Sequence, residues 1–130
     1  MRRTFQIALL VVAFLPFALG TTTLLAGGAR FLPEELVTPQ LDSQLRFYSI
    51  FSLLPFLIAT WIVRNLDSAS SILAIVMCAT AAAGAARLLS AAQLGVMEPA
   101  MIGAVVIEIG VLGFIPWHRA VLARSESAAA

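Results

Sequence analysis

The sequence predicts an all-α membrane protein, a bundle of four transmembrane helices. Hydrophobic residues make up 61% of the 130-residue chain and the mean hydropathy is +0.98, more apolar surface than a soluble domain of this size can bury. Four nearly uncharged runs have the roughly 20 residues that a hydrocarbon core of about 30 Å requires. None of them alternates polar and apolar residues as barrel strands do, so helices are the expected spans.

We expect a single domain over residues 1–130, with helices at about 5–26, 40–63, 69–94 and 99–120. Turn-forming residues separate the runs. Gly27-Gly28 ends the first helix, and Thr38-Pro39 begins the second, because proline suits the first helical turn. Asn65-Leu-Asp67-Ser68 and Gly95-Val-Met-Glu98-Pro99 form the next two turns.

Three further features modify this simple picture. Pro16 and Pro55 are predicted to kink the first and second helices. The small, polar tail at residues 125–130 is predicted to fray. Arg2 and Arg3, followed by an apolar run, also fit a signal peptide cleaved near Gly20. Because the run continues to residue 25, which is long enough to span a bilayer, we expect a retained first helix, with cleavage as the alternative.

The distribution of arginines predicts the orientation. One side of a four-span chain would carry Arg2, Arg3, Arg64, Arg119 and Arg124. The opposite connections hold most of the acidic residues and Arg30. The positive-inside rule therefore places both termini and the middle turn in the cytoplasm. Trp61 and Trp117 lie where an aromatic belt would meet that side of the membrane.

Three charges fall inside the predicted spans, where each costs roughly 2.5 to 3.5 kcal/mol near a helix centre. Arg87 lies about seven residues from the end of the third helix, and Glu108 about nine residues into the fourth, hence roughly 10 and 13 Å deep. Arg46 lies one to two turns into the second helix on the same side. We predict a buried cluster in the outer half of the bundle, with Glu108 between the arginines and with Ser90 and Asp42 as further members.

The face of the third helix that carries Arg87 also carries small residues. Ala83, Gly84, Ser90 and Ala91 share it at spacings of three and four residues. Small residues let membrane helices approach closely, so Arg87 is predicted to point into the bundle.

Simpler interpretations of these charges remain open. Arg46 can pair with Asp42 one turn earlier and mark the interface, and Arg87 with Glu108 can form a purely structural bridge. Two arginines paired with one glutamate, however, leave an excess positive charge in the membrane interior, where no water solvates it. That excess calls for a second anion, either Asp42, Glu98 or a group of a ligand.

The sequence indicates little other chemistry. The net charge is +1 and no basic run is present, so no nucleic-acid partner is expected. A single cysteine, Cys78, allows no disulfide or cysteine-based metal site within one chain. No phosphate-binding loop, metal-ligand spacing or nucleophile signature occurs. No catalytic residue, cofactor or metal is therefore predicted, and His118, next to Trp117, is interpreted as an interfacial residue.

Two segments carry a resemblance to a known family, Leu41-Asp-Ser-Gln-Leu-Arg46-Phe47 and Gly84-Ala-Ala-Arg87-Leu-Leu-Ser90, together with the later Glu108. The chain resembles the bacterial four-helix membrane proteins of domain-of-unknown-function family 4345. That family has an Arg early in the second helix, an Arg-x-x-Ser in the third, then Gly, Pro and an intramembrane Glu. The chain departs from its usual Gly-x-Pro turn, because three residues separate Gly95 from Pro99. The resemblance implies the fold and the polar positions, and no activity.

Three classes of function remain. The first, which the sequence favours, is a scaffold or accessory subunit that packs against a larger membrane complex or a second copy, and lipid-facing small residues would support it. The second is a binding or transport module for a small anion or an anionic lipid or other amphiphile. The third is an enzyme acting on a quinone or lipid, with Glu108 as acid or base. In each case we expect a multi-pass protein of the bacterial inner membrane.

Overall fold

The structure is a computed structural model that describes residues 1–127, apart from the side chain of Glu126. It contains helices and no strand within those residues, and four helical stretches are long and apolar enough to cross a membrane. These stretches are Arg2–Arg30, Pro39–Arg64, Ser70–Leu94 and Pro99–Ser125. The predicted fold class of four membrane-spanning helices is therefore confirmed.

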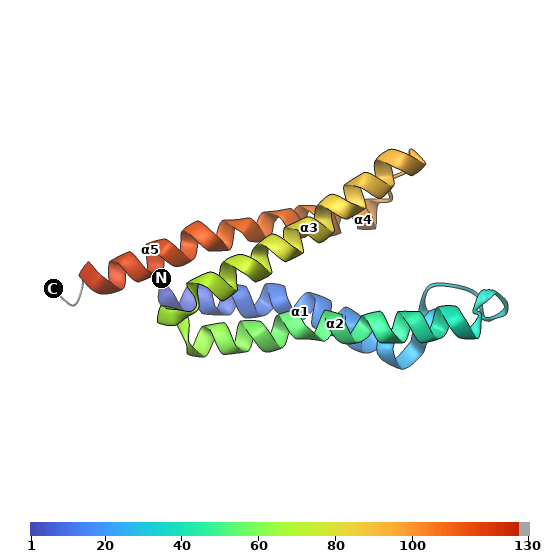
Figure 1. The fold of residues 1–130 in the computed structure, drawn as a ribbon, viewed down its shortest axis with the longest axis horizontal. Helices are drawn as coiled ribbons and strands as arrows, with labels where there is room; N and C mark the ends of the chain where they lie inside the picture. Colours follow the sequence, from blue (N-terminus) through green and yellow to red (C-terminus); the bar gives the residue numbers. More distant parts are fainter. Residues whose placement is uncertain (128–130) are drawn as a thin grey trace. The chain divides into compact units, whose positions relative to one another are not determined.

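The chain forms two compact units (Figure 1). The N-terminal unit is Gln6–Arg64, and the C-terminal unit combines Met1–Phe5 with the chain from Asn65 onward. Whether the chain is a single domain stays a prediction.

The N-terminal unit is a hairpin of two helices that run side by side (Figure 1). They are α1 (Arg2–Ala26), which belongs to this unit from Gln6 onward, and α2 (Pro39–Arg64). The short 3-10 turns η1 (Gly27–Arg30) and η2 (Glu34–Leu36) join them. At Gly20 the two backbones approach closely, since a Cβ there would lie 2.9 Å from the carbonyl oxygen of Ser49. Near the other end of the hairpin, the Gln6 side chain donates a hydrogen bond to the carbonyl of Val63 at 3.0 Å.

In the C-terminal unit, a second helical hairpin follows the 3-10 turn η3 (Leu66–Ser68). Helix α3 (Ser70–Leu94) ends at Gly95, whose φ of 69° is the left-handed conformation that closes many helices. The chain then returns along α4 (Pro99–Gly110), η4 (Val111–Gly113) and α5 (Phe114–Ser127). Helix α4 begins with proline, as predicted.

The fourth span differs from the prediction of one continuous helix, because η4 interrupts it. Pro116 explains the break, since it has no N–H to donate to the carbonyl of Leu112 and its ring crowds that carbonyl. By contrast, α1 and α2 are each assigned as one helix across Pro16 and Pro55. Helix α5 also extends to Ser127, into the tail that was predicted to fray. Residues 128–130 of that tail lie outside the described residues.

An aromatic cluster forms the core of the C-terminal unit. Phe5 is fully buried, and its ring contacts Phe114, Trp117 and His118 at centroid distances of 5.4 to 5.6 Å. Aromatic pairs at this separation stabilise beyond their buried area. The first turn of α1 is therefore fixed against α5.

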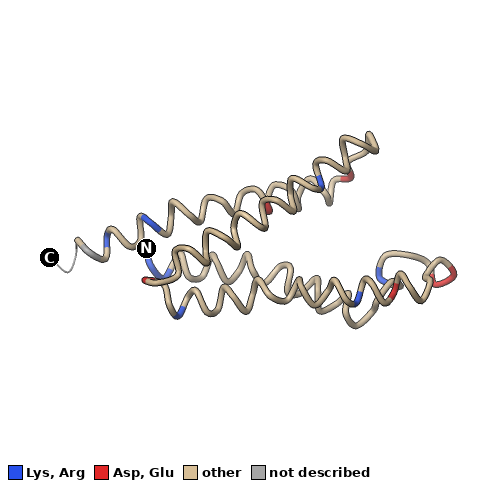
Figure 2. The backbone as a smooth tube through the Cα atoms, viewed as in Figure 1, with Lys and Arg blue, Asp and Glu red and all other residues tan. Residues whose placement is uncertain are grey.

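The outward surfaces of the helices are strongly apolar. Large side chains such as Leu25, Ile75 and Val106 are more than half exposed, and Figure 2 shows long stretches of helix without charge. Such surface is unfavourable in water and stable in hydrocarbon. This is the pattern of a multi-pass membrane protein.

An ion pair joins the turn between α2 and α3 to the first residue of α1, and the stability that it contributes should depend on pH. Arg2 donates a hydrogen bond to the Asp67 carboxylate at 2.8 Å, and this bond lowers the pKa of Asp67. Because the pKa of Asp67 is lower in the folded than in the unfolded protein, the ion pair stabilises the fold at pH values above the ordinary aspartate pKa of about 3.9. This stabilisation is lost as the pH falls through the lowered pKa. We expect Arg2→Gln to raise the pKa of Asp67 in a carboxyl NMR titration in micelles, and Arg3→Gln to leave it unchanged. Equal midpoints in all three proteins would contradict the assignment.

Candidate functional site

Arg87 and Glu108 form an ion pair between α3 and α4. The Arg87 Nε donates to both carboxylate oxygens of Glu108, at 3.0 Å each. The hairpin explains the pairing, because the two residues lie at comparable distances from the turn that joins Leu94 to Pro99. The predicted contact between Arg87 and Glu108 is therefore present.

Gly84 allows the two helices to approach at this ion pair. It is buried, and a Cβ at this position would lie 3.0 Å from the Cβ of Glu108 and 3.2 Å from the Cγ1 of Ile109. Contacts that short are tighter than ordinary van der Waals packing. The absence of a side chain at Gly84 therefore lets α4 bring Glu108 next to Arg87, as the small residues on this face predicted.

The exposure of the ion pair differs from the predicted buried cluster. The Glu108 side chain is 18% exposed and the Arg87 side chain is 47% exposed. Only the Nε of Arg87 donates to Glu108. Its terminal nitrogens, Nη1 and Nη2, have no hydrogen-bond partner among the described residues. The guanidinium thus holds the carboxylate with one edge and leaves up to four N–H donors open.

Arg46 forms a separate ion pair with Asp42, one turn earlier on α2. The Nε of Arg46 lies 2.7 Å from a carboxylate oxygen of Asp42. Its Nη1 also donates to the carbonyl oxygens of Leu24 and Leu25, at 2.6 and 3.1 Å. These carbonyls belong to the last turn of α1, where a cation satisfies otherwise unpaired acceptors. Arg46 therefore caps the first helix.

Asp42 holds the turn that follows α1. Its second carboxylate oxygen accepts a hydrogen bond from the backbone N–H of Gly28 at 2.8 Å. Gly27 has a φ of 62°, and a Cβ there would lie 1.8 Å from Asp42 Oδ1. The pair of glycines predicted to end the first helix therefore also makes room for the Asp42 carboxylate.

The two arginines thus have one carboxylate each, in two different units. The excess positive charge inferred from two arginines against one glutamate is absent, because Asp42 supplies the second anion. A single cluster that unites Arg46, Arg87 and Glu108 stays a prediction. Ser90 is partly buried and makes no hydrogen bond to another described residue.

Two polar residues have roles that the sequence did not indicate. His118 is 1% exposed, and its Nε2–H donates to the carbonyl oxygen of Leu66 at 2.9 Å. Its side chain therefore belongs to the core of the C-terminal unit, a burial that its interpretation as an interfacial residue did not anticipate. Arg30 folds back onto α1, where its Nη1 donates to the carbonyl of Leu19 and to the hydroxyl of Thr23, at 2.6 and 2.8 Å. Both interactions depend on how the turns fold back, which local sequence patterns do not report.

The described residues hold no group of three or more His, Cys, Asp or Glu side chains that could bind a metal ion. Of the residues in the predicted site, Arg46 pairs with Asp42 and Arg87 pairs with Glu108. A comparison with protein families gives a match to the model of DUF4345, a domain of unknown function, over residues 4–118. The chain belongs to the DUF4345 family. The region that matches DUF4345 contains the Arg46–Asp42 and Arg87–Glu108 ion pairs. Searches of curated proteins and of solved structures gave no match to the chain.

Proposed function

We propose that this protein is an accessory subunit that docks a transmembrane helix of a partner onto one face of α3. Four exposed small residues, Ala79, Ala82, Ala83 and Ala86, support the proposal. Their spacing of three, four and seven residues places them on one side of a helix that turns about 100° per residue. We call this surface the alanine face.

A surface of this kind suits another helix better than it suits lipid. Between helices in a bilayer the hydrophobic effect gives no driving force, so association depends on close backbone packing at small residues. Bulky apolar side chains, Ile75 and Leu89, are exposed on α3 one turn before and one turn after the alanines, where the exposed side chains are smaller. A partner helix can therefore approach α3 most closely along the alanines.

Arg87 supplies a polar contact at the edge of the alanine face. It follows Ala86 directly and lies between the alanine face and the side of α3 that packs on α4, where Gly84 is buried. Its open Nη atoms can donate to a carbonyl or carboxylate of a partner. Polar groups inside a membrane are stabilised by such contacts between helices. Glu108 acts as a positioning residue, because it fixes the guanidinium from the other side.

Leucine substitutions test the proposal with a matched control on the same helix. Ala83→Leu is expected to remove a co-purifying protein from native mass spectra of the protein extracted from its own membranes, since the added side chain separates the helices. Ala85→Leu, which changes an exposed alanine outside the alanine face, should leave the complex intact. Both variants should melt like the wild type.

Two outcomes would overturn the accessory function. If wild-type spectra show only the monomer, no partner helix is docked. If Ala83→Leu lowers the melting temperature by several degrees while Ala85→Leu does not, the alanine face belongs to the core of the chain itself. A second copy in the wild-type spectra would identify the partner as this same protein.

A second candidate function is the binding of an anionic amphiphile, favoured by the open Nη atoms of Arg87. Phosphate and carboxylate groups match the two parallel donors of a guanidinium, and Arg87 is within about 10 Å of the end of its span. In the same spectra, a bound amphiphile would add a small mass that Arg87→Gln removes. The enzyme alternative gains no support, because Arg87 already engages both oxygens of Glu108.

The proposed orientation places both termini in the cytoplasm, with the chain in a bacterial inner membrane. Arg2, Arg3, Arg64, Arg119 and Arg124 support it through the positive-inside rule. In this orientation the Arg87–Glu108 pair lies in the outer half of the bilayer, so a partner would contact Arg87 there.

A further inference from the structure

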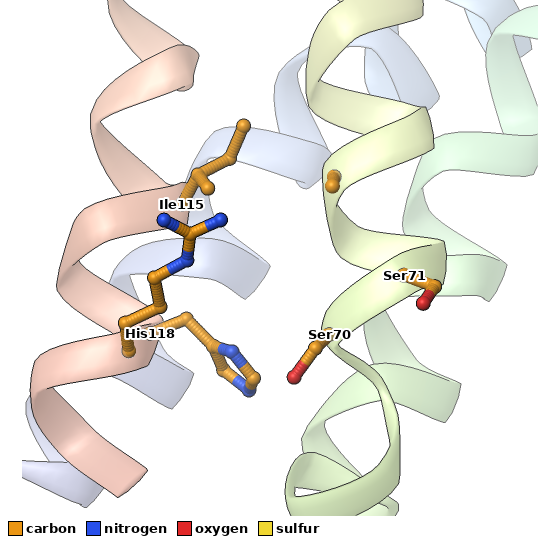
Figure 3. A pocket seen from close by; sticks show the side chains of 6 residues that line it. Ser70, Ser71, Ile115 and His118 are labelled. Carbon is orange, nitrogen blue, oxygen red and sulfur yellow. The ribbon is translucent and has the colours of Figure 1, made fainter. Parts of the chain in front are cut away.

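A small cavity lies between the beginning of α3 and the first half of α5, within the C-terminal unit. Its volume is about 190 Å³, and it is lined by Ser70, Ser71, Ala74, Ile115, His118 and Arg119. Figure 3 shows the side chains of Ser70 and His118 extending toward the same space from the two helices. Because the third span begins at Ser70, the cavity lies at the depth where a membrane meets water. It shares no residue with the alanine face or with the Arg87–Glu108 pair.

Two polar groups that line this cavity, on Arg119 and Ser70, have no hydrogen-bond partner among the described residues. Arg119 is exposed, and its guanidinium makes no hydrogen bond or ion pair to any described side chain or backbone atom. The hydroxyl of Ser70 likewise has no partner in the described part of the chain. One full positive charge and a hydroxyl donor are therefore both available at one cavity.

The surrounding charges favour an anion. None of the six lining residues is acidic. The nearby turn contains Asp67, but Arg2 already binds that carboxylate at 2.8 Å. Helix α3 adds a smaller contribution, because Ala69 gives its first turn no side-chain cap, and open N–H groups at a helix start attract negative charge.

His118 fixes the geometry of the cavity. Its ring is almost fully buried, its Nε2–H is bound to the carbonyl of Leu66, and its ring packs 5.6 Å from that of Phe5. These contacts hold α5 against the turn that precedes α3. The backbone of Arg119, the next residue on α5, is thereby fixed in the wall of the cavity that Ser70 also lines, which lowers the cost of ordering the site when a ligand binds.

We propose that this cavity binds a phosphate group, with Arg119 as its cation and Ser70 as a hydroxyl donor. A guanidinium can form two parallel hydrogen bonds to phosphate oxygens. At this depth the phosphate can come from a lipid head group or from a soluble phosphate compound. In either case the ligand chemistry is the same, and His118 is a positioning residue.

Binding of two probes to the delipidated full-length protein in neutral detergent tests the site. The probes are inorganic phosphate and short-chain phosphatidic acid, each titrated by isothermal calorimetry. Arg119→Gln is expected to weaken binding about tenfold or more, the usual effect of losing a hydrogen bond to a charged group. The matched control is Arg124→Gln, which changes the next arginine of α5, a residue that contacts the sulfur of Met1. This control should bind within about twofold of the wild type.

Each outcome decides the proposal. Saturable binding of phosphatidic acid alone, weakened by Arg119→Gln, assigns the cavity to a lipid head group. Binding of both probes, weakened in the same way, assigns it to phosphate in general. If neither probe binds saturably, or if Arg119→Gln and Arg124→Gln weaken binding equally, the phosphate site is overturned. Unchanged melting of Arg119→Gln without probe shows that a loss of binding does not arise from unfolding.

Discussion

Replacing Gly27 with alanine is expected to lower the free energy of unfolding by about 3 kcal/mol or more. Two costs combine at this position. An alanine in the left-handed conformation that Gly27 adopts, with a φ of 62°, costs roughly 1 to 2 kcal/mol. Its Cβ would also lie 1.8 Å from Asp42 Oδ1, so the carboxylate must move and its hydrogen bond from Gly28 is lost, at about 1.5 to 3 kcal/mol.

Gly95 provides the matched control for this substitution. Its φ of 69° is nearly the same, but nothing lies within 4 Å of a Cβ built there. Gly95→Ala should therefore cost only the conformational term, roughly 1 to 2 kcal/mol. Reversible unfolding in mixed detergent micelles gives both values. Equal losses in the two variants would show that the contact with Asp42 contributes nothing to stability.

Replacing Glu108 with leucine is expected to cost about 3 kcal/mol, because it leaves Arg87 without its anion inside a span. The partial exposure of Arg87, 47% of its side chain, places the expected loss at the lower end of the range for broken ion pairs. The double replacement Arg87→Met with Glu108→Leu should recover most of the loss, since two apolar side chains suit the membrane interior. Reversible unfolding of the three proteins measures these differences.

Glu98→Leu controls for the removal of a carboxylate as such. Glu98 is exposed at the beginning of α4 and forms no ion pair with another described residue, so its replacement should change stability by less than about 0.5 kcal/mol. A double variant no more stable than Glu108→Leu alone would contradict the structural role of the pair. It would show that Arg87 does not depend on Glu108.

The four spans were predictable because they depend on one local quantity, the length of apolar chain that crosses a bilayer. The contact between Arg87 and Glu108 was predictable for a related reason. Two helices joined by a short turn must run antiparallel, and residues at similar distances from that turn then meet at similar depth. Length and rise per residue were sufficient for both predictions.

The interactions of Arg46 were only partly predictable. Its spacing from Asp42 allowed an ion pair within α2, and the sequence left this as an alternative to the three-charge cluster. The contacts of Arg46 with the carbonyls of Leu24 and Leu25 depend on how the connection between α1 and α2 folds back, and no periodicity reports that path. The break in the fourth span was missed because Pro116 acts on the preceding turn, where η4 lies.

The burial of His118 shows a similar limit. An apolar run gives no sign of which side chain will meet an unpaired carbonyl from another turn, here that of Leu66. The exposure of Arg87 was missed because the sequence does not show which face of α3 packs within the chain. Its small neighbours were assigned to helix contacts within the chain, whereas Ala83 is exposed and only Gly84 is buried against α4.

Site-specific photo-crosslinking in intact membranes tests the docking of a partner on the alanine face most directly. A photoreactive residue at position 83 is expected to form a crosslinked product of higher mass with another protein chain. The same residue at position 85, which is also exposed on α3, should form little or none. Crosslinks to lipid alone at both positions, or equal protein crosslinks at both, would contradict the docking of a partner helix on the alanine face.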